Sequence, residues 1–229
     1  MISASTSTPT AGPSPNTSPA APAAGMSVRA LACRRGRRLL FSGLDFGLAP
    51  GSITWLRGRN GSGKTSLLRI LAGLSAQAEG ELRQNGAVLA HSAGRADILY
   101  IGHANALKDD LTLTEALAFL ARLQGLDNAP ARARAALTRL GLASRADAPV
   151  RTLSQGQRRR GALARLALDH VPRTWLLDEP YDALDADSAA CLSGLIQDHA
   201  ARGGAVLLTS HQAALDLWGV ETLDLEPAA

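Results

Sequence analysis

The segment GRNGSGKT at 58–65 is the part of the sequence whose residue types indicate chemistry most directly. It follows an apolar run and precedes helix-forming residues, the setting in which the spacing G-x-x-x-x-G-K-[S/T] forms a phosphate-binding loop. Glycines let successive N–H groups approach phosphate oxygens, Lys64 supplies a compact charge for β- and γ-phosphates, and the Thr65 hydroxyl suits Mg²⁺. The residues expected to bind a nucleotide are Gly58, Arg59, Asn60, Gly61, Ser62, Gly63, Lys64, Thr65 and Ser66.

Two carboxylates end a second apolar run, TWLLDEP at 174–180. Asp178 would lie at the carboxyl end of a strand, beside the phosphate loop, where it suits Mg²⁺ coordination through water. Glu179 is placed to orient the attacking water or to take a proton from it, as phosphoryl transfer requires. A strand that ends in Asp-Glu is by itself more often plain surface, so this interpretation depends on the loop at 58–65.

The stretch LSQGQRRRGALARL at 153–166 predicts a helix whose start can bind an anion. A serine hydroxyl, backbone N–H groups and the positive end of the helix dipole would point toward the ligand. The alternative is an ordinary helix cap with a solvated basic face. The residues expected to contact the anion are Ser154, Gln155, Gly156 and Gln157.

Strands and helices alternate along the chain, as is needed to bring these motifs together. The alternation indicates an α/β fold built on a mostly parallel sheet. Helices are expected over about 64–73 and 186–201, and another before the last strand. The expected strands are 28–33, 39–48, SITWLRG before the loop, EGELRQNG, 97–101, 174–178, 205–209 and one near the end of the sequence.

Helical spacing dominates the middle of the chain, which predicts a helical subdomain inserted at about 102–168 in a domain spanning 26–229. Thr112 with Glu115 forms a capping box, Asn128 precedes a second helix, and Ser154 is placed to cap a third. Residues 1–25 differ from the rest, because 20 of the 25 are Ser, Thr, Pro or Ala and none is charged. We expect them to be a disordered tail, and Met26 is an alternative start that would leave them untranslated.

Composition excludes several classes of function. The net charge of +4 comes from 24 basic residues of which only Lys64 and Lys108 are lysine, and the eight aromatics are scattered, so no nucleic-acid partner is expected. No apolar run reaches the roughly 18 residues that a spanning helix needs, so a membrane role requires a partner. Cys33 and Cys191 are expected to be thiols in a reducing compartment rather than a disulfide.

In order and spacing these motifs resemble the ATP-binding cassette (ABC) family, whose Walker A, signature and Walker B sequences correspond to GRNGSGKT, LSQGQ and TWLLDE. The resemblance implies a RecA-like P-loop NTPase core with an antiparallel β subdomain and an inserted α-helical subdomain. It implies an ATPase in which two copies enclose two ATP molecules with Mg²⁺ bound by Thr65 and Asp178. Ser154 and Gly156 of one copy would complete the site built on Lys64 of the other.

Three further positions take roles from the same resemblance. Asp185, in the D-loop ALD, would bridge the two sites, and His211 would contact the γ-phosphate and act with Glu179 as a catalytic residue. His103 occupies the Q-loop position, where most members carry Gln. It would either contact Mg²⁺ or water, or pack at the subdomain joint. The aromatic that usually stacks on adenine is missing, so Arg34 or Arg35 is expected to replace it.

Narrower matches, in LYIGH, LKDDLTLTEAL and GGAVLLTSHQ, resemble the ATPase subunits of haem exporters that serve cytochrome c biogenesis. This implies a homodimer bound to a CcmB-like integral membrane permease with a CcmC-like protein, at the cytoplasmic face of the inner membrane. Haem would be involved only indirectly, since no haem-ligating pattern occurs. The alternatives are another ABC exporter or importer, or a non-transport ABC ATPase acting on ribosomes or nucleic acid. Core packing is expected of the tryptophans, and surface or structural positions are expected of the remaining histidines: Trp55, Trp175, Trp218, His91, His170 and His199.

Overall fold

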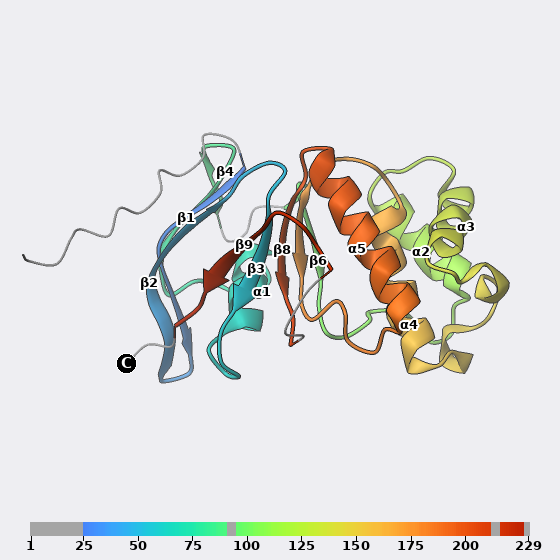
Figure 1. Cartoon of the computed structure of the whole chain (residues 1–229), viewed down its shortest axis with the longest axis horizontal. Coiled ribbons are helices and arrows are strands. Elements are labelled where there is room, and N and C mark those ends of the chain that lie inside the picture. The colour runs from blue at the N-terminus through green and yellow to red at the C-terminus, as the bar shows by residue number, and fades with distance from the viewer. Residues whose placement is uncertain (1–24, 91–94, 212–215, 227–229) are drawn as a thin grey trace, which may run out of the picture.

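The computed structural model describes residues 25–90, 95–211 and 216–226. An antiparallel sheet, a parallel sheet and a group of helices follow one another along the long axis of the molecule (Figure 1). The antiparallel sheet has the strand order β2-β1-β4-β5. Its strands are β1 (Met26–Arg35), β2 (Arg38–Leu48), β4 (Glu79–Gln84) and β5 (Ala87–Val88). The predicted antiparallel β subdomain is therefore present.

The second sheet has five parallel strands in the order β6-β7-β8-β3-β9. Every residue of β7 and β8 is buried, as expected when both faces of a parallel sheet are covered. Because the strands are parallel, their carboxyl ends meet at one edge, where the phosphate loop, Asp178 and the segment after β8 must lie together. The strands are β3 (Ile53–Arg57), β6 (Ile98–Ile101), β7 (Thr174–Leu177), β8 (Ala205–Thr209) and β9 (Val220–Asp224).

Helix α1 (Lys64–Leu71) starts directly after the phosphate loop and packs between the two sheets. Its buried side chains belong to one hydrophobic cluster with β1, β2 and the centre of the parallel sheet. The helix ends two residues before the predicted limit of 73, because Gly73 takes a φ of 73° and so leaves the helix. The phosphate loop is therefore held between the end of β3 and the start of α1.

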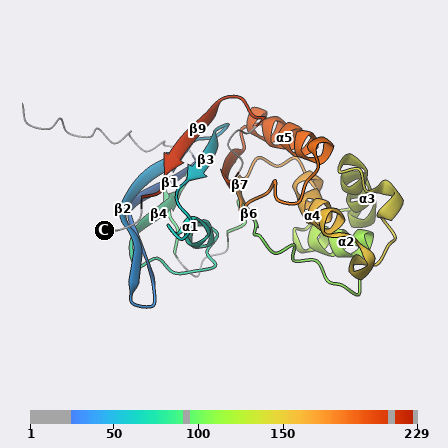
Figure 2. The same ribbon diagram turned by 60° about the horizontal axis from the view of Figure 1, so that its bottom comes forward.

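The helices of the middle of the chain lie beyond the parallel sheet, where Figure 2 shows them grouped on the side of β6 and β7. Both predicted capping boxes are present: the Thr112 hydroxyl accepts from the Glu115 N–H, and Ser154 accepts from the Gln157 N–H. Asn128 does precede a helix, but it takes a φ of 52° and its side chain makes no cap bond. The helices are α2 (Leu113–Leu123), α3 (Ala129–Arg139), α4 (Gln155–Leu163) and, alongside the sheet, α5 (Ala186–Ala201).

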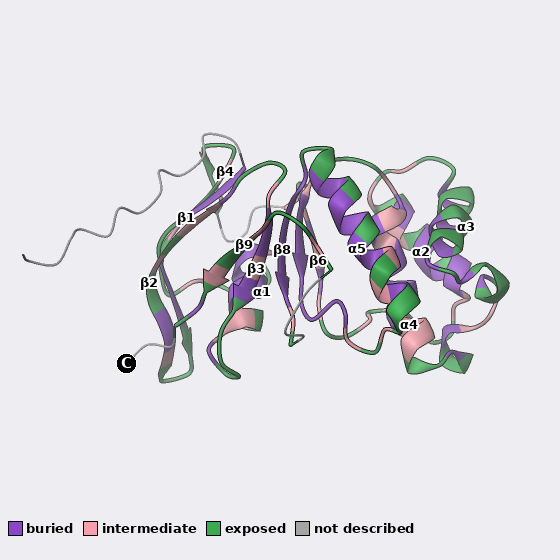
Figure 3. Ribbon diagram, in the orientation of Figure 1, coloured by how far each residue is buried: buried purple, intermediate pink, exposed green. Residues whose placement is uncertain are grey.

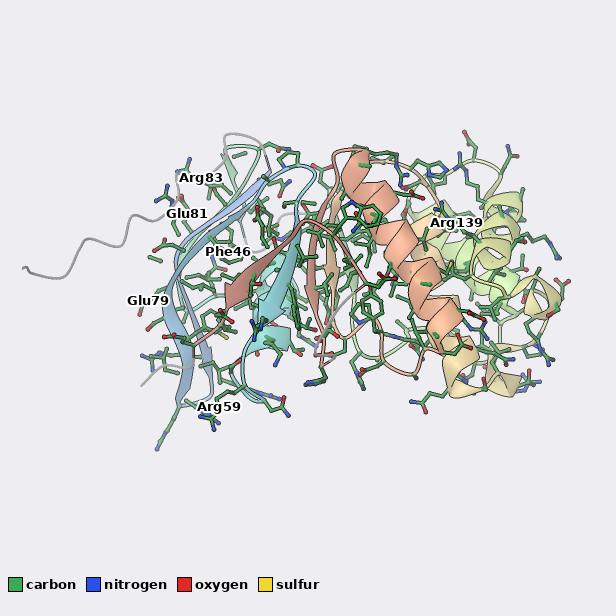
Figure 4. All side chains as sticks on the ribbon, in the orientation of Figure 1. Phe46, Arg59, Glu79, Glu81, Arg83 and Arg139 are labelled. Atoms are coloured by element: carbon green, nitrogen blue, oxygen red, sulfur yellow. The ribbon has the colours of Figure 1, made fainter. Side chains whose placement is uncertain are left out.

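Contacts from several elements attach these helices to the sheet. Figure 3 colours each residue by how far it is buried. Arg139 at the end of α3 forms an ion pair with Asp198 of α5 (Figure 4 labels Arg139), and the Cys191 thiol of α5 donates to the Arg139 carbonyl at 3.0 Å. Cys191 and Cys33 are free thiols, as predicted. α5 thus links the sheet to the helical region.

His199 is a structural residue of the core. Its ring stacks on Trp175 with 3.6 Å between ring centroids, and its Nε2 lies 2.8 Å from the Arg173 carbonyl oxygen. A Cβ at Gly204 would lie 2.0 Å from the same ring nitrogen, so only glycine fits there. Burial lowers the pKa of His199 to about 4, so the ring is neutral at pH 7.

Near the end of the chain, the structure differs from the expectation for Trp218 and describes only part of the segment where a last helix was expected. Trp218 was expected in the core, yet it is 74% exposed, because it lies in an irregular segment before β9 rather than on a sheet face. The helix expected between β8 and β9 is absent from the described part of that segment, whereas 212–215 lie outside the described residues. His91 and, apart from Gly25, the predicted tail also lie outside them. In the described ranges, no helix is both long and apolar enough to cross a bilayer.

Candidate functional site

The phosphate loop lies between β3 and α1 and needs glycine at two points. At Gly58, with a φ of 155°, an added Cβ would lie 2.7 Å from Ser62 Oγ, and at Gly63, with a φ of 107°, it would crowd Phe41 at 3.1 Å. Lys64 Nζ donates to the Gly58 carbonyl at 2.8 Å, so the lysine side chain lies back across the loop. Figure 4 places Arg59 at this edge of the molecule.

Asp178 directly follows β7 and is 3% exposed. Its Oδ1 accepts hydrogen bonds from the hydroxyls of Thr65, at 3.2 Å, and Thr209, at 3.1 Å. Its Oδ2 is buried without a hydrogen-bond partner. A buried carboxylate oxygen that lacks a partner and stands beside a hydroxyl provides the oxygen ligands that Mg²⁺ takes in proteins, so these residues fit that ion.

Glu179 follows in an unusual backbone conformation, with a φ of 49°. Its N–H donates to the Thr209 hydroxyl at 2.8 Å, and its Oε1 lies 3.5 Å from Nε2 of His211. The other carboxylate oxygen is buried without a partner. Burial raises the pKa of Glu179 above its ordinary value, and the nearby His211 opposes that shift. A raised pKa favours the protonated form of this carboxyl.

A cavity of about 430 Å³ lies over these groups. One wall comes from the β1–β2 hairpin, which contributes Arg35, Arg38 and Leu40, whereas Arg34 does not line it. Sequence reasoning missed Arg38 and Leu40, although the run RRGRR signals a basic hairpin tip. The remaining lining residues are those of the phosphate loop and of the three strand ends: Asn60, Gly61, Gly63, Lys64, Thr65, Ser66, His103, Asp178, Glu179 and His211.

His103 follows β6 at the rim of this cavity. It is exposed, and its Nδ1 lies 3.8 Å from an Asp182 carboxylate oxygen. Its exposure and its place in the cavity lining favour the first of the two possibilities left open by the sequence, contact with Mg²⁺ or water, over packing in the subdomain joint.

The candidate anion-binding residues on α4 lie apart from this cavity. Ser154 and Gln155 are exposed, Gly156 and Gln157 are half-buried, and none of the four lines the cavity. Asp185 is exposed as well, and it caps α5 by accepting from the Ser188 N–H at 2.9 Å. Hydrogen bonds from the Ser188 side chain and backbone lower the pKa of its carboxyl. One chain thus carries a cavity lined by carboxylates and histidines and, separately, an exposed helix start whose serine hydroxyl caps its own helix.

Comparison with known proteins settles the family. The model of the ABC transporter family matches residues 41–182. Cytochrome c biogenesis ATP-binding export protein CcmA of Aromatoleum aromaticum is 48% identical over 201 residues, which cover 87% of this chain and 94% of that protein. CcmA of Methylococcus capsulatus is 47% identical, with 85% and 94% covered. The chain belongs to the CcmA group of the ABC transporter family.

Solved ABC structures share the fold. A structure described as the ATP-binding subunit of an ABC transporter superposes with a TM-score of 0.74 at 26% identity, covering 82% of this chain and 79% of that one. The dimeric post-hydrolysis structure of the ATP-binding cassette MJ0796, bound to ADP and Pi, gives 0.73 at 21% identity, with 82% and 88% covered. The predicted α/β P-loop fold is confirmed, and as an ABC protein the chain binds and hydrolyses ATP.

Proposed function

We propose that the chain hydrolyses ATP in the cavity over Lys64 and drives an export step of cytochrome c biogenesis, most directly the haem exporter. The observation that carries the proposal is the assembly around the phosphate loop: Asp178 bound by the Thr65 hydroxyl, and Glu179 beside His211, all at one sheet edge. The names of the relatives, which are export proteins of cytochrome c biogenesis, support the cargo pathway.

Each group then has one task. The loop N–H groups and Lys64 bind the phosphates, and Lys64 exchanges its present bonds to loop carbonyls for phosphate oxygens. Thr65 and Asp178 would hold Mg²⁺, which neutralises charge on the β- and γ-phosphates when bound. Glu179 accepts a proton from the attacking water. His211, whose Nε2 lies 3.5 Å from Glu179 Oε1, orients that water against the γ-phosphate.

The purine base is held without an aromatic side chain. Arg35 and Arg38, from the hairpin beside the loop, line the same cavity as Leu40. We propose that a guanidinium plane stacks on the base while Leu40 packs against it, because a planar cation and an apolar side chain together can replace an aromatic ring.

A second copy of the chain completes each site. Ser154 and Gln155 are exposed and lie outside the cavity of their own chain. The Ser154 hydroxyl accepts from the Gln157 N–H but keeps its own proton to donate, so this helix start can face a γ-phosphate held by a partner. Asp185, exposed at the start of α5, would lie between the two sites. The solved dimeric cassette bound to ADP and Pi is an example of such pairing.

The dimer would act on a membrane protein. We propose a CcmB-like permease, with a CcmC-like protein, as the partner at the cytoplasmic face of the inner membrane, so that the chain is peripheral and meets haem only through that complex. A role on ribosomes or nucleic acid has no observation in its favour.

Substitution of Glu179 by Gln tests the mechanism. The variant should bind ATP as the wild type does, hydrolyse it at least roughly 100-fold more slowly, and accumulate as dimers in Mg-ATP, because the step that separates the copies is lost. Glu79→Gln, at an exposed position of β4 (Figure 4), is the control and should behave as wild type. Wild-type turnover in Glu179→Gln would remove this residue from catalysis.

The export pathway needs a test of its own. A strain that lacks the gene and carries the Lys64→Ala variant should fail to accumulate covalently bound haem in its c-type cytochromes, whereas the wild-type gene restores it. Normal haem staining with Lys64→Ala would exclude the haem pathway and leave the ATPase assignment intact.

A further inference from the structure

Arg159 is a buried arginine on α4 that has no role in the mechanism proposed above. It is 3% exposed, although arginine is rarely so deeply buried unless it is fully paired. It lies five residues after Ser154, on the helix whose start is exposed. Burial lowers the pKa of Arg159, and the carboxylates of Asp182, Asp178 and Glu179 counter that shift, so the guanidinium remains charged.

The guanidinium of Arg159 donates to main-chain carbonyls from two strand ends. Nη2 donates to the carbonyl oxygens of Asp178, at 3.0 Å, and of Glu179, at 2.7 Å. Nη1 donates to the carbonyl of Gly102, at 2.9 Å, which immediately precedes His103. One side chain therefore joins α4, the end of β7 and the end of β6.

These bonds bear directly on the geometry of Glu179. Its φ of 49° is a strained conformation for a non-glycine residue, and it persists only where the surroundings impose it. Thr209 binds the N–H of Glu179 and Arg159 binds its carbonyl, so the residue is fixed from both sides. Displacing Arg159 would release one of these two restraints and turn the carboxylate away from the cavity.

We propose that Arg159 is a positioning residue that couples the signature helix α4 to the carboxylate of Glu179 in the same chain. The proposal rests on the proposed function, in which the exposed start of α4 contacts ATP held by a second copy. When that contact forms, it fixes the position of α4 and therefore of Arg159. Arg159 then holds the Glu179 carboxylate in the orientation that hydrolysis needs. Each chain thus detects the nucleotide bound in its partner's site and positions its own Glu179 in response.

The coupling is tested with Arg159→Lys, which keeps the charge but lacks the planar fork that reaches three carbonyls. In the full chain with its membrane partner, the variant should lower kcat roughly 10- to 100-fold through misplacement of Glu179, while Kd for a fluorescent ATP analogue changes less than about 3-fold. The Hill coefficient for ATP hydrolysis should fall towards 1.

The matched control is Arg158→Lys on the next residue of α4. Arg158 also donates to main-chain carbonyls, those of Leu153 and Arg151, but both belong to the helical region and neither touches a strand end. It should keep wild-type kcat and Hill coefficient. If Arg158→Lys lowers kcat as much as Arg159→Lys, the effect is general damage to α4 and the proposal is wrong.

A double variant separates this inference from the proposed mechanism. If Arg159 acts through Glu179, Arg159→Lys should cause no further loss of kcat in a Glu179→Gln background. Losses that add in full would overturn the coupling while the mechanism stands, and so would wild-type kcat in Arg159→Lys. Thermal melting verifies folding; should Arg159→Lys unfold, Arg159→Gln, which carries no charge to bury, is measured in its place with the same expected loss of kcat at unchanged Kd.

Discussion

Adjacent carboxylates at residues 178 and 179 have different environments, and this difference decides their roles. Asp178 accepts two hydroxyl bonds that hold its carboxylate beside the phosphate loop, as a metal ligand needs. Glu179 has one carboxylate oxygen buried without a hydrogen-bond partner, and burial raises its pKa, as a proton acceptor needs. Since neighbours along a strand end point in different directions, one dipeptide would supply both proposed functions.

At the residue scale, the hairpin arginines allow a prediction about the base. Arg38→Ala should weaken ATP binding roughly 5-fold, the effect of losing about 1 kcal/mol of cation–π stacking, and should weaken GTP binding by the same factor, because a stacked plane does not distinguish base edges. Equilibrium binding of fluorescent nucleotides measures this, with tripolyphosphate as a ligand that lacks a base.

The control for that experiment is Arg34→Ala, since Arg34 belongs to the same hairpin but does not line the cavity. It should leave all three affinities unchanged. Loss of tripolyphosphate binding in Arg38→Ala would mean that the arginine contacts phosphate, and the stacking proposal would be wrong.

Most of the site could be predicted at this scale, because its residues stand in local motifs. The loop, Asp178, Glu179 and His211 were all found from the sequence, and the structure brings them around one cavity. Arg159 could not be found in this way, and the run RRGRR indicates a basic hairpin tip but not that Arg38 lines the cavity. Their positions depend on how a hairpin and a helix fold back on the strand ends, and no spacing along the chain records that approach.

At the scale of elements, the two capping boxes have the same chemistry, but only the one at the start of α4 is proposed to contact a second chain. The hydroxyls of Thr112 and Ser154 each accept from the N–H three residues on, and their own backbone N–H groups donate to the side-chain oxygens of Glu115 and Gln157. Both helix starts were predictable from the sequence, because the cap is a local pattern. The ends of elements were less so: α1 stops early at Gly73, and the exposure of Trp218 follows from an irregular loop.

These two caps provide a matched pair of substitutions. Thr112→Ala and Ser154→Ala should each destabilise the fold by about 1 kcal/mol, which urea unfolding measures. Only Ser154→Ala should also abolish ATP-dependent pairing and hydrolysis, because only this hydroxyl is proposed to reach a second chain. Equal ATPase activity in the two variants would contradict the assignment of Ser154.

At the scale of the whole molecule, His199 makes stability depend on pH. Its pKa in the folded chain is about 4, below the ordinary value of 6.5, so between these values the unfolded chain takes up a proton that the folded chain does not. Stability is therefore greatest above about pH 6.5 and declines as the pH falls towards 4, by at most roughly 3 kcal/mol from this residue.

Urea unfolding between pH 4 and 7.5 tests this dependence. His199→Phe, which keeps a ring to stack on Trp175, should flatten the decline, although losing the bond to the Arg173 carbonyl lowers stability at neutral pH. His170→Gln, at an exposed position, should leave the profile unchanged. An equally steep decline in His199→Phe would show that other groups cause it.

The strand that carries the phosphate loop has neighbours from late in the sequence. β3 is bonded to β8 on one side and to β9 on the other, so both partners of residues 53–57 come from position 205 onward. During synthesis the loop is made early, yet the strand that supports it stays unpaired until nearly all of the described chain has left the ribosome. The nascent polypeptide should therefore be unable to capture nucleotide before residues 205–224 have been synthesised.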